Sequence, residues 1–176
     1  FTASINMASL RFLHRLQFKD SSLTVTFNQH MAEMARRYGA PETRLVPTPI
    51  ARHFLETPVK APNKELRSVL YAGRVAPEKN VEAVLEAAER LPHIHFLVAG
   101  DGPLRDLVLQ KTQELPNLEY LGWVSREDVC TTIDSADMLV LPSHVEAFGT
   151  IALEAMARQR LVMVSPKCGI VEWPKL

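Results

Sequence analysis

The sequence has few cysteines, no net charge and no long apolar run, and each of these absences narrows the choice of protein class. Cys130 and Cys168 are the only cysteines among 176 residues and form no CxxC or zinc-type spacing, so we expect reduced thiols in a cytosolic protein. No run approaches the roughly 18 apolar residues of a membrane span. Basic and acidic side chains number 20 each, so the whole-chain charge does not indicate a nucleic-acid partner.

This charge balance hides a difference between the two ends of the chain. Residues 1–60 hold 8 basic and 4 acidic side chains, whereas residues 61–176 hold 12 basic and 16 acidic ones. The difference indicates two segments with different surfaces. The sequence opens inside an amphipathic stretch without an initiator methionine and stops just after a new element, so we expect a fragment: one domain plus a piece of another.

The residues before position 66 read as an irregular set of short elements. Apolar spacing and breaker residues predict a helix over 5–18, a strand over 21–27, a helix over 28–40 that Gly39 and Pro41 stop, an extended segment over 43–54, and a linker rich in proline and charge over 56–65.

From residue 66 onward strands and helices alternate regularly. The pattern predicts strands over 67–75, 94–102, 117–124, 137–143 and 160–165, separated by helices over 80–91, 104–115, 125–136 and 148–159. The strands are short and apolar without a polar alternation, which is typical of strands that are buried on both faces. We therefore predict an α/β fold with a Rossmann-like, doubly wound parallel sheet.

In such a sheet, ligands bind beyond the carboxyl ends of the strands. The residues that follow the first four strands are therefore the candidate site: Gly73, Arg74 and Lys79; Gly100, Asp101 and Gly102; Trp123 and Val124; and Ser143, His144, Glu146, Phe148, Gly149, Thr150 and Ile151, with Glu154 further along the last helix.

The residue types at this edge of the sheet suit a phosphorylated sugar. Arg74, Lys79 and the start of a helix near Gly149 would bind a diphosphate without a metal, so we predict no metal site and no cofactor. Ionised Glu146 and Glu154 only accept hydrogen bonds and would hold hydroxyl groups of sugar and ribose. Together these preferences indicate a nucleotide sugar.

Each of these signals, taken alone, also has an ordinary structural explanation. Glu146 is a common type of charge at a helix N-terminus, and Glu154 is an ordinary helix residue. Arg74 and Lys79 are also explained as solvated charges near a turn. A Gly-Asp-Gly stretch is more often a tight turn than a phosphate loop. The prediction therefore depends on the residues occurring together.

Four motifs in order resemble the retaining GT-B glycosyltransferases of glycosyltransferase family 4, often called group 1. The stretch "PSHVEAFGTIALEAMA" at 142–157 matches the family's block of two glutamates separated by seven residues. "GRVAPEK" at 73–79, "AGDGP" at 99–103 and "LGWV" at 121–124 match further blocks. Residues 21–54 resemble, more loosely, the end of an acceptor domain and the crossover from it.

The resemblance implies a role for each matched residue. Arg74 and Lys79 would bind the donor diphosphate and stabilise the leaving nucleotide, and Gly73 would let the backbone approach the phosphates. Glu146 would hold the transferred hexose, and Glu154 would hold the ribose. The remaining roles are hydrogen bonds to the sugar from Phe148 and Gly149, contact with the diphosphate for Thr150 and Ile151, and nucleobase contact for Trp123 and Val124.

The resemblance also implies a domain division and a set of partners. Residues 1–55 would be the end of the acceptor domain with the crossover, 56–65 a linker, and 66–176 the donor-binding domain. The donor would be a UDP- or GDP-linked sugar, and the acceptor, a sugar or a lipid-linked molecule, would bind to segments outside this chain. We expect the chain alone to be inactive, the longer protein to be cytoplasmic with peripheral membrane association left open, and no nucleic-acid partner.

Two departures and two other interpretations accompany this resemblance. The crossover reads "TPIA" instead of the usual N-G-V-D, and the late G-G-x-x-E turn reads "CGIVE", with Cys168 in place of a glycine. A nucleotide-sugar-binding module without catalysis, completed by another subunit, is the main alternative function. A structural scaffold is the other, although it has no physical need of Arg74, Lys79, Glu146 and Glu154 at one edge.

Overall fold

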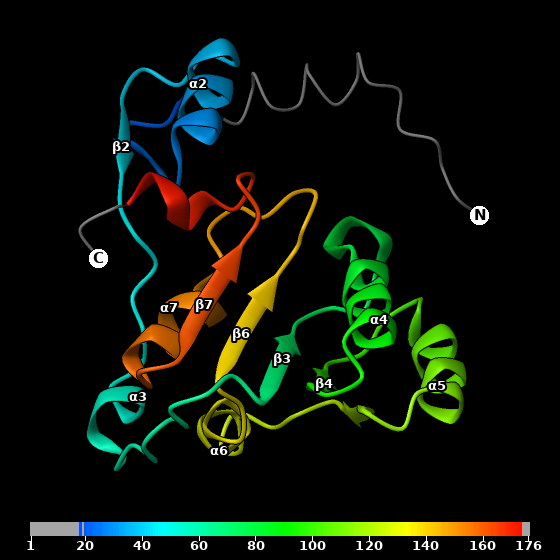
Figure 1. The fold of residues 1–176 in the computed structure, drawn as a ribbon. Helices are drawn as coiled ribbons and strands as arrows, with labels where there is room; N and C mark the ends of the chain where they lie inside the picture. Colours follow the sequence, from blue (N-terminus) through cyan, green and yellow to red (C-terminus); the bar gives the residue numbers. More distant parts are fainter. Residues whose placement is uncertain (1–17, 19, 174–176) are drawn as a thin grey trace. The chain divides into compact units, whose positions relative to one another are not determined.

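The computed structural model describes residue 18 and residues 20–173, and the chain forms two compact units, Phe1–Thr48 and Pro49–Leu176 (Figure 1). The helix predicted over 5–18 lies, apart from Phe18, outside the described residues. Within the described part, no helix has the length and apolar content that crossing a membrane requires.

The first unit contains a pair of short parallel strands joined through one helix. β1 (Thr24–Thr26) pairs with β2 (Thr43–Leu45), and α2 (Gln29–Arg37) connects them. The Asn28 side chain caps α2 by accepting a hydrogen bond from the Met31 N–H at 2.7 Å. The predicted strand and helix are confirmed here, whereas the predicted extended segment over 43–54 is a strand only at β2.

The second unit is built on a five-stranded sheet in which every strand pair is parallel. The strands are β3 (Ser68–Ala72), β4 (His95–Ala99), β5 (Leu118–Gly122), β6 (Met138–Leu141) and β7 (Leu161–Val164), and their order in space is β5-β4-β3-β6-β7. This order matches the first five strands of a Rossmann fold, which confirms the predicted fold class.

Four helices connect these strands: α4 (Val81–Arg90), α5 (Arg105–Glu114), α6 (Val129–Asp134) and α7 (Thr150–Ala157), with the 3-10 turn η1 (Pro77–Lys79) ahead of α4. The short helix α3 (His53–Glu56) precedes β3, and the 3-10 turn η2 (Gly169–Glu172) follows β7. The prediction of a helix over 125–136 was too long, because Ser125 Oγ bonds Asp128 at 2.6 Å in a turn ahead of α6.

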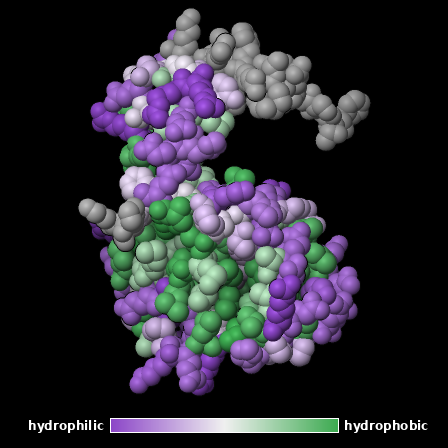
Figure 2. Space-filling view, turned by 45° about the horizontal axis from the view of Figure 1, so that its top comes forward, coloured by the Kyte–Doolittle hydropathy of each residue, from purple (hydrophilic) through white to green (hydrophobic). Residues whose placement is uncertain are grey.

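The core of this unit follows the two-residue period of its strands. Val69 and Tyr71 of β3 belong to a buried cluster with side chains of β4, α4 and α5. Leu141 of β6 approaches Gly149 at the start of α7. Figure 2 shows apolar side chains gathered on one face of this unit, and Leu161 and Met163 of the edge strand β7 are among its exposed large apolar side chains.

The segment predicted as a linker, 56–65, lies in the second unit, where buried side chains hold it. Arg158, which is only 1% exposed, donates hydrogen bonds to the carbonyl oxygens of Thr57 at 2.6 Å and Pro58 at 2.9 Å. Asp137 accepts two more from Asn63, at 3.2 Å and 2.9 Å. The segment is therefore attached to the sheet along its length, and the division between the units falls ahead of it, between residues 48 and 49.

Candidate functional site

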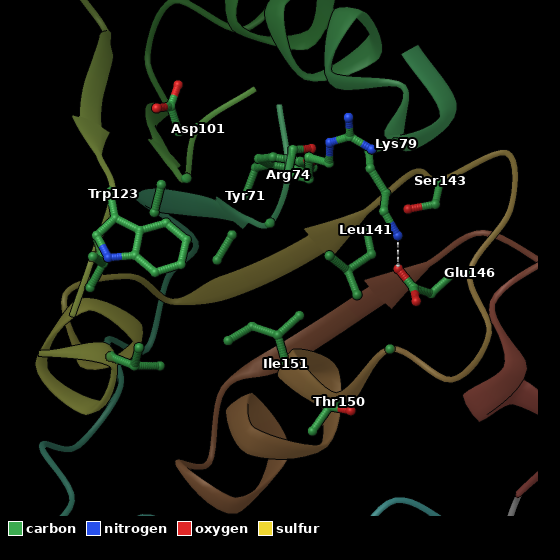
Figure 3. A pocket seen from close by; sticks show the side chains of 17 residues that line it. Tyr71, Arg74, Lys79, Asp101, Trp123, Leu141, Ser143, Glu146, Thr150 and Ile151 are labelled. Carbon is green, nitrogen blue, oxygen red and sulfur yellow. Dashed lines mark hydrogen bonds and ion pairs between the residues drawn. The ribbon is translucent and has the colours of Figure 1, made fainter. Parts of the chain in front are cut away.

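A pocket of about 570 Å³ lies at the carboxyl ends of the central strands β3 and β6 (Figure 3). These two strands are neighbours, but the chain proceeds from them in opposite directions across the sheet. Ligands of open parallel sheets bind at such a switch point, and the volume is within the roughly 300 to 1,000 Å³ of small-molecule sites.

Most of the predicted site residues line this one pocket. Those that do are Gly73, Arg74, Lys79, Gly100, Asp101, Trp123, Val124, Ser143, Glu146, Gly149, Thr150 and Ile151. They come from the segments after β3, β4, β5 and β6, so the sheet brings together residues that are up to 78 positions apart in the sequence.

The central polar feature of the pocket is an ion pair between Lys79 and Glu146. Lys79 stands at the end of η1, and Glu146 lies in the loop between β6 and α7. Lys79 Nζ is 2.5 Å from Glu146 Oε2, and the two side chains are 23% and 19% exposed (Figure 3). Because both groups are mostly withdrawn from water, this pair is held more firmly than a surface pair.

Arg74 lies at the same side of the pocket but is far more exposed. Its Nη1 pairs with Glu78 Oε1 at 3.1 Å, and its side chain is 65% exposed. The Tyr71 hydroxyl donates a hydrogen bond to the Arg74 carbonyl at 2.6 Å. Burial raises the pKa of Tyr71, and Glu146 adds to this effect, so the hydroxyl stays protonated as a donor. The Arg74 backbone is thus fixed, while its exposed guanidinium is held by a surface pair with Glu78 that contributes little stability and that a ligand can replace.

Glycine is required where two segments of the pocket wall meet. A Cβ added to Gly100 would lie 1.8 Å from the Gly73 carbonyl oxygen, so the two backbones touch directly. Gly149 has a φ of 88°, a left-handed conformation that favours glycine, at the N-cap of α7. The first N–H groups of an α-helix have no partner within the helix, so α7 begins with free donors at the pocket wall.

Ser143 contributes a buried hydroxyl to the pocket. The residue is 1% exposed, and its Oγ has no hydrogen-bond partner among the residues that the structure describes. Its position is fixed through the backbone, because its carbonyl accepts a hydrogen bond from Ser165 Oγ at 2.6 Å. A buried polar atom without a partner is costly, which is a reason to expect one in the bound state.

Trp123 and Val124 form the side of the pocket that lies away from the ion pair. Figure 3 shows Trp123 and Asp101 on the side of the pocket away from Glu146. The Trp123 side chain is 82% exposed, although it belongs to a residue type that usually buries most of its area. This side of the pocket therefore presents a flat apolar surface to solvent.

Four predicted site residues do not line the pocket: Gly102, His144, Phe148 and Glu154. Gly102 allows close backbone packing, since an added Cβ would lie 2.3 Å from the Val75 carbonyl oxygen. The His144 side chain points into solvent, and Phe148 is buried below the loop. Glu154 is half-buried on α7; burial raises its pKa, and Arg126 opposes the shift.

Five residues of the pocket wall are not among the predicted site residues: Tyr71, Ala72, Ala99, Val129 and Leu141. Four of them are among the last residues of β3, β4 and β6, which the pattern assigned to the core. The signal that could have found them is their position, because the final residues of a strand lie at the edge where the site forms.

Residues 55–174 match the sequence family described as Glycosyl transferases group 1. Among curated proteins, the chain is 30% identical over 168 residues to alpha-D-kanosaminyltransferase from Streptomyces kanamyceticus, which covers 92% of this chain and 36% of that protein. It is 35% identical over 98 residues to D-inositol 3-phosphate glycosyltransferase from Mycobacterium leprae, covering 51% of this chain and 23% of that protein.

Solved structures show the same fold. Sucrose-phosphate synthase from Thermosynechococcus elongatus superposes with a TM-score of 0.71 at 23% identity, covering 97% of this chain and 47% of that one. Anabaena HepE in complex with UDP and glucose superposes with a TM-score of 0.75 at 19% identity, covering 94% and 50%.

The matches cover most of this chain but only part of the length of its relatives. The chain spans less than half the length of the curated relatives named above. The family match nevertheless covers most of the chain and includes the whole pocket. The chain therefore belongs to the group 1 family of glycosyl transferases.

Proposed function

We propose that this chain is the donor-binding part of a glycosyltransferase that transfers a hexose from a UDP- or GDP-linked sugar to an acceptor with retention of configuration. The observation that carries the proposal is the Lys79–Glu146 pair beside the start of α7, in a pocket at the switch point of the sheet. Retention, and membership of family 4, rest on the motif in which seven residues separate Glu146 from Glu154.

The diphosphate of the donor would lie between Lys79, Arg74 and the start of α7. Lys79 is within the pocket, Arg74 can leave its surface pair for a ligand, and the N–H groups of Thr150 and Ile151 belong to the unpaired first turn of the helix. Cationic side chains and a helix N-terminus both favour phosphate oxygens. A diphosphate would take over Lys79 from Glu146, which would release the carboxylate.

The released Glu146 carboxylate would then bind hydroxyl groups of the hexose. It is acceptor-only when ionised, so hydroxyl donors are its natural partners. Gly149 would add a backbone N–H, and the buried Ser143 hydroxyl would gain its missing partner there. The nucleobase would lie at the other side of the pocket against Trp123, Val124 and Gly100. The ribose would then lie between the nucleobase and the diphosphate, on the side toward Glu154.

Catalysis would come from stabilising the leaving group. As the bond from the anomeric carbon to the phosphate oxygen breaks, negative charge grows on the departing nucleoside diphosphate. Fixed positive groups that face this charge lower the barrier. Lys79, Arg74 and the start of α7 supply them without a metal ion, so we propose metal-independent transfer.

The acceptor would bind to parts of the longer protein outside this chain, so we propose that the chain alone binds donor but does not transfer sugar. We further propose that the longer protein acts in the cytoplasm, in the synthesis of polysaccharides, glycolipids or glycoconjugates. Turnover of UDP-glucose or GDP-mannose by the 176-residue chain, with simple sugars as acceptors, would contradict the proposed inactivity.

The binding proposal is tested by calorimetric titration of the chain with UDP and with GDP. We expect one of the two to bind and the Arg74→Ala, Lys79→Ala double variant to bind it about 10- to 100-fold more weakly, because charge-assisted hydrogen bonds are lost. The matched control is Arg90→Ala, which removes another exposed arginine from an i,i+4 pair, with Glu86, and should leave affinity unchanged. Equal affinity in the double variant, or no binding of either nucleotide by the parent chain, would overturn the proposal.

A further inference from the structure

The loop that carries Glu146 is bonded to a second segment from much later in the chain. Glu146 and Cys168 form an isolated parallel bridge, in which Gly169 N–H donates to the Glu146 carbonyl at 3.0 Å. Ile170 N–H donates to the Phe148 carbonyl at 2.9 Å. The loop between β6 and α7 is therefore held from behind by residues 168–170, and the position of Glu146 depends on them.

The Cys168 side chain lies at the closest point of this contact. Its thiol donates a hydrogen bond to the Phe148 carbonyl at 3.2 Å, and the residue is fully buried. A Cβ added to Gly149 would lie 2.6 Å from Cys168 Sγ, so the sulfur packs directly against the Gly149 backbone. Cys168 itself is not part of the pocket wall.

The thiol keeps its proton in these surroundings. Burial raises the pKa of Cys168; the Ile170 N–H opposes this shift, Glu146 supports it, and Lys79 opposes it. A protonated thiol donates, whereas a thiolate would repel the Phe148 carbonyl oxygen. The Phe148 carbonyl thus receives two donors, the Ile170 N–H and the Cys168 S–H, and both fix its position.

We propose that Cys168 is a positioning residue for the donor site, acting through Phe148 and Gly149 to set Glu146 and the first N–H groups of α7. The proposal rests on the donor-binding function proposed above. A smaller side chain at 168 would leave space behind Gly149 and release one hydrogen bond to Phe148. A larger side chain would displace the Gly149 backbone, which lines the pocket. In both cases a substitution at Cys168 would change the affinity for the donor, although the donor does not touch this residue.

The test compares Cys168→Ser, Cys168→Ala and Cys168→Val by titration with the nucleotide that the parent chain binds and by thermal unfolding. Serine keeps a donor of similar shape and should preserve affinity within about threefold. Alanine should weaken binding by about 3- to 10-fold through the lost hydrogen bond. Valine, whose second branch crowds Gly149, should weaken it by at least about tenfold.

The matched control is Cys130→Ala, which removes the other buried thiol. Cys130 lies on α6, it is 4% exposed, and it does not line the pocket. We expect Cys130→Ala and Cys168→Ala to lower the melting temperature by similar amounts, with weaker nucleotide binding only in Cys168→Ala. A purely structural role for Cys168 would give two variants with the same stability loss and the same unchanged affinity, which would overturn the proposal.

A second measurement separates this proposal from the function on which it rests. Amide hydrogen exchange of residues 146–151, without nucleotide, should be faster in Cys168→Ala than in Cys130→Ala, because the loop loses a hydrogen bond only in the first variant. If the parent chain bound no nucleotide, the proposed function would fail, and unchanged exchange would also reject the role of Cys168. If Arg74→Ala, Lys79→Ala lost binding while all Cys168 variants kept it, only the role of Cys168 would fail.

Discussion

Asp137 and Ser143 lie at opposite ends of strand β6, and their hydrogen bonding differs completely. Asp137, just before the strand, accepts five hydrogen bonds from Asn63, Arg67 and Ser68. Ser143, just after the strand, has a buried hydroxyl without a partner in the described part of the chain. At one end of β6 the Asp137 carboxylate is fully hydrogen-bonded, whereas at the other end the Ser143 hydroxyl has no partner among the described residues.

The charged groups at the two ends repeat this contrast. At the amino end, Arg158 is 1% exposed and bonds both a carboxylate, Asp134, and three backbone carbonyls. At the carboxyl end, Lys79 and Glu146 are about one fifth exposed, and among the described residues each has the other as its side-chain partner. We infer that the amino end mainly serves stability, because Arg158 and Asp137 hold residues 57–68 there, although Arg160 Nε and Nη1 are buried without a partner among the described residues. The carboxyl end serves ligand binding, because its unpartnered Ser143 hydroxyl lines a pocket together with the Lys79–Glu146 pair.

The largest expected effect tests the amino end. Arg158→Ala leaves three backbone carbonyl oxygens without their donor and leaves Asp134 with the longer bond from Arg160 at 3.3 Å, so we expect a loss of about 3 to 5 kcal/mol in the free energy of unfolding. Urea titration measures it through the midpoint. Nucleotide affinity of the folded protein should be unchanged, because Arg158 lies at the end of the sheet away from the pocket.

Arg158→Lys is the matched variant for this prediction. Lysine keeps the charge but cannot reach the carboxylate and the carbonyls together, so the loss should be smaller than for alanine. A loss of under about 1 kcal/mol in the free energy of unfolding of Arg158→Ala would show that the amino end does not serve stability. A loss of similar size in the free energy of nucleotide binding would show that the amino end also serves the ligand.

The second prediction concerns the pH dependence of the amino end. Burial raises the pKa of Asp137, but hydrogen bonds from Arg67, Ser68 and Asn63 outweigh burial and leave the pKa below its ordinary value. An acid whose pKa is lowered by folding stabilises the protein above its unfolded value, about 4, and this contribution disappears as the pH falls through the lowered pKa.

Asp137→Asn removes this contribution. We expect the variant to be less stable by about 2 to 3 kcal/mol at pH 7, because the amide replaces one acceptor by a donor that faces other donors. In urea titrations from pH 7 to pH 3, the gap between the variant and the parent should stay constant down to about pH 4 and then narrow. A gap that is independent of pH would show that the charge of Asp137 contributes nothing.

The third prediction tests the ligand end through Glu154. Burial raises its pKa, with Arg126 opposing, so its ionisation costs stability as the pH rises from its ordinary value through the raised one. Glu154→Gln should raise the melting temperature by about 1 to 3 °C at pH 7 and have no effect below about pH 4. If Glu154 binds ribose hydroxyls, the variant should also bind nucleotide about 3- to 10-fold more weakly.

Glu89→Gln is the control for Glu154, because Glu89 is an exposed glutamate on α4 and should change neither stability nor affinity. A Glu154→Gln variant with higher stability and undiminished affinity would remove Glu154 from the donor site and assign it to the helix alone. Weaker nucleotide binding by Glu154→Gln would assign Glu154 to ligand binding, and unchanged binding would assign it to the folded structure of α7 alone.

Sequence patterns predicted the ligand end better than the amino end, for a physical reason. The ends of parallel strands meet at one edge, so Gly73, Gly100 and Glu146 could be assigned to one site without knowledge of their contacts. The amino end depends on pairs such as Arg158 with Thr57, which are about 100 positions apart. No local period reports such a pair, so residues 56–65 read as a linker.

The errors within the site have an equally local cause. Tyr71 and Leu141 were assigned to the core because apolar strand residues carry no sign of which ones end at a pocket. Glu154 does not line the pocket itself, because a helix rises about 1.5 Å per residue and Glu154 lies a full turn beyond Thr150; its ribose contact stays a prediction. The close packing of the Cys168 sulfur against the Gly149 backbone has no signal in the sequence.

The smallest expected effect concerns backbone conformation at the two ends. Asn80 precedes α4 at the ligand end and Gln159 follows α7, and both adopt a left-handed φ, of 54° and 59°. Asparagine tolerates this conformation, and Asn80 Nδ2 also bonds the Pro142 carbonyl at 3.2 Å. Gln159 is exposed and adopts a conformation that favours glycine, and its side chain forms no hydrogen bond with the residues that the structure describes.

Gln159→Gly should therefore stabilise the protein by about 0.5 to 1 kcal/mol, whereas Asn80→Gly should be neutral or destabilising because it loses the bond to Pro142. Urea midpoints of the two variants measured side by side decide this. Equal gains would mean that the Asn80 side chain contributes nothing to the loop ahead of Glu146. A gain confined to Gln159→Gly would show that strain at the ligand end is offset by a side-chain contact, while strain at the end of α7 is not.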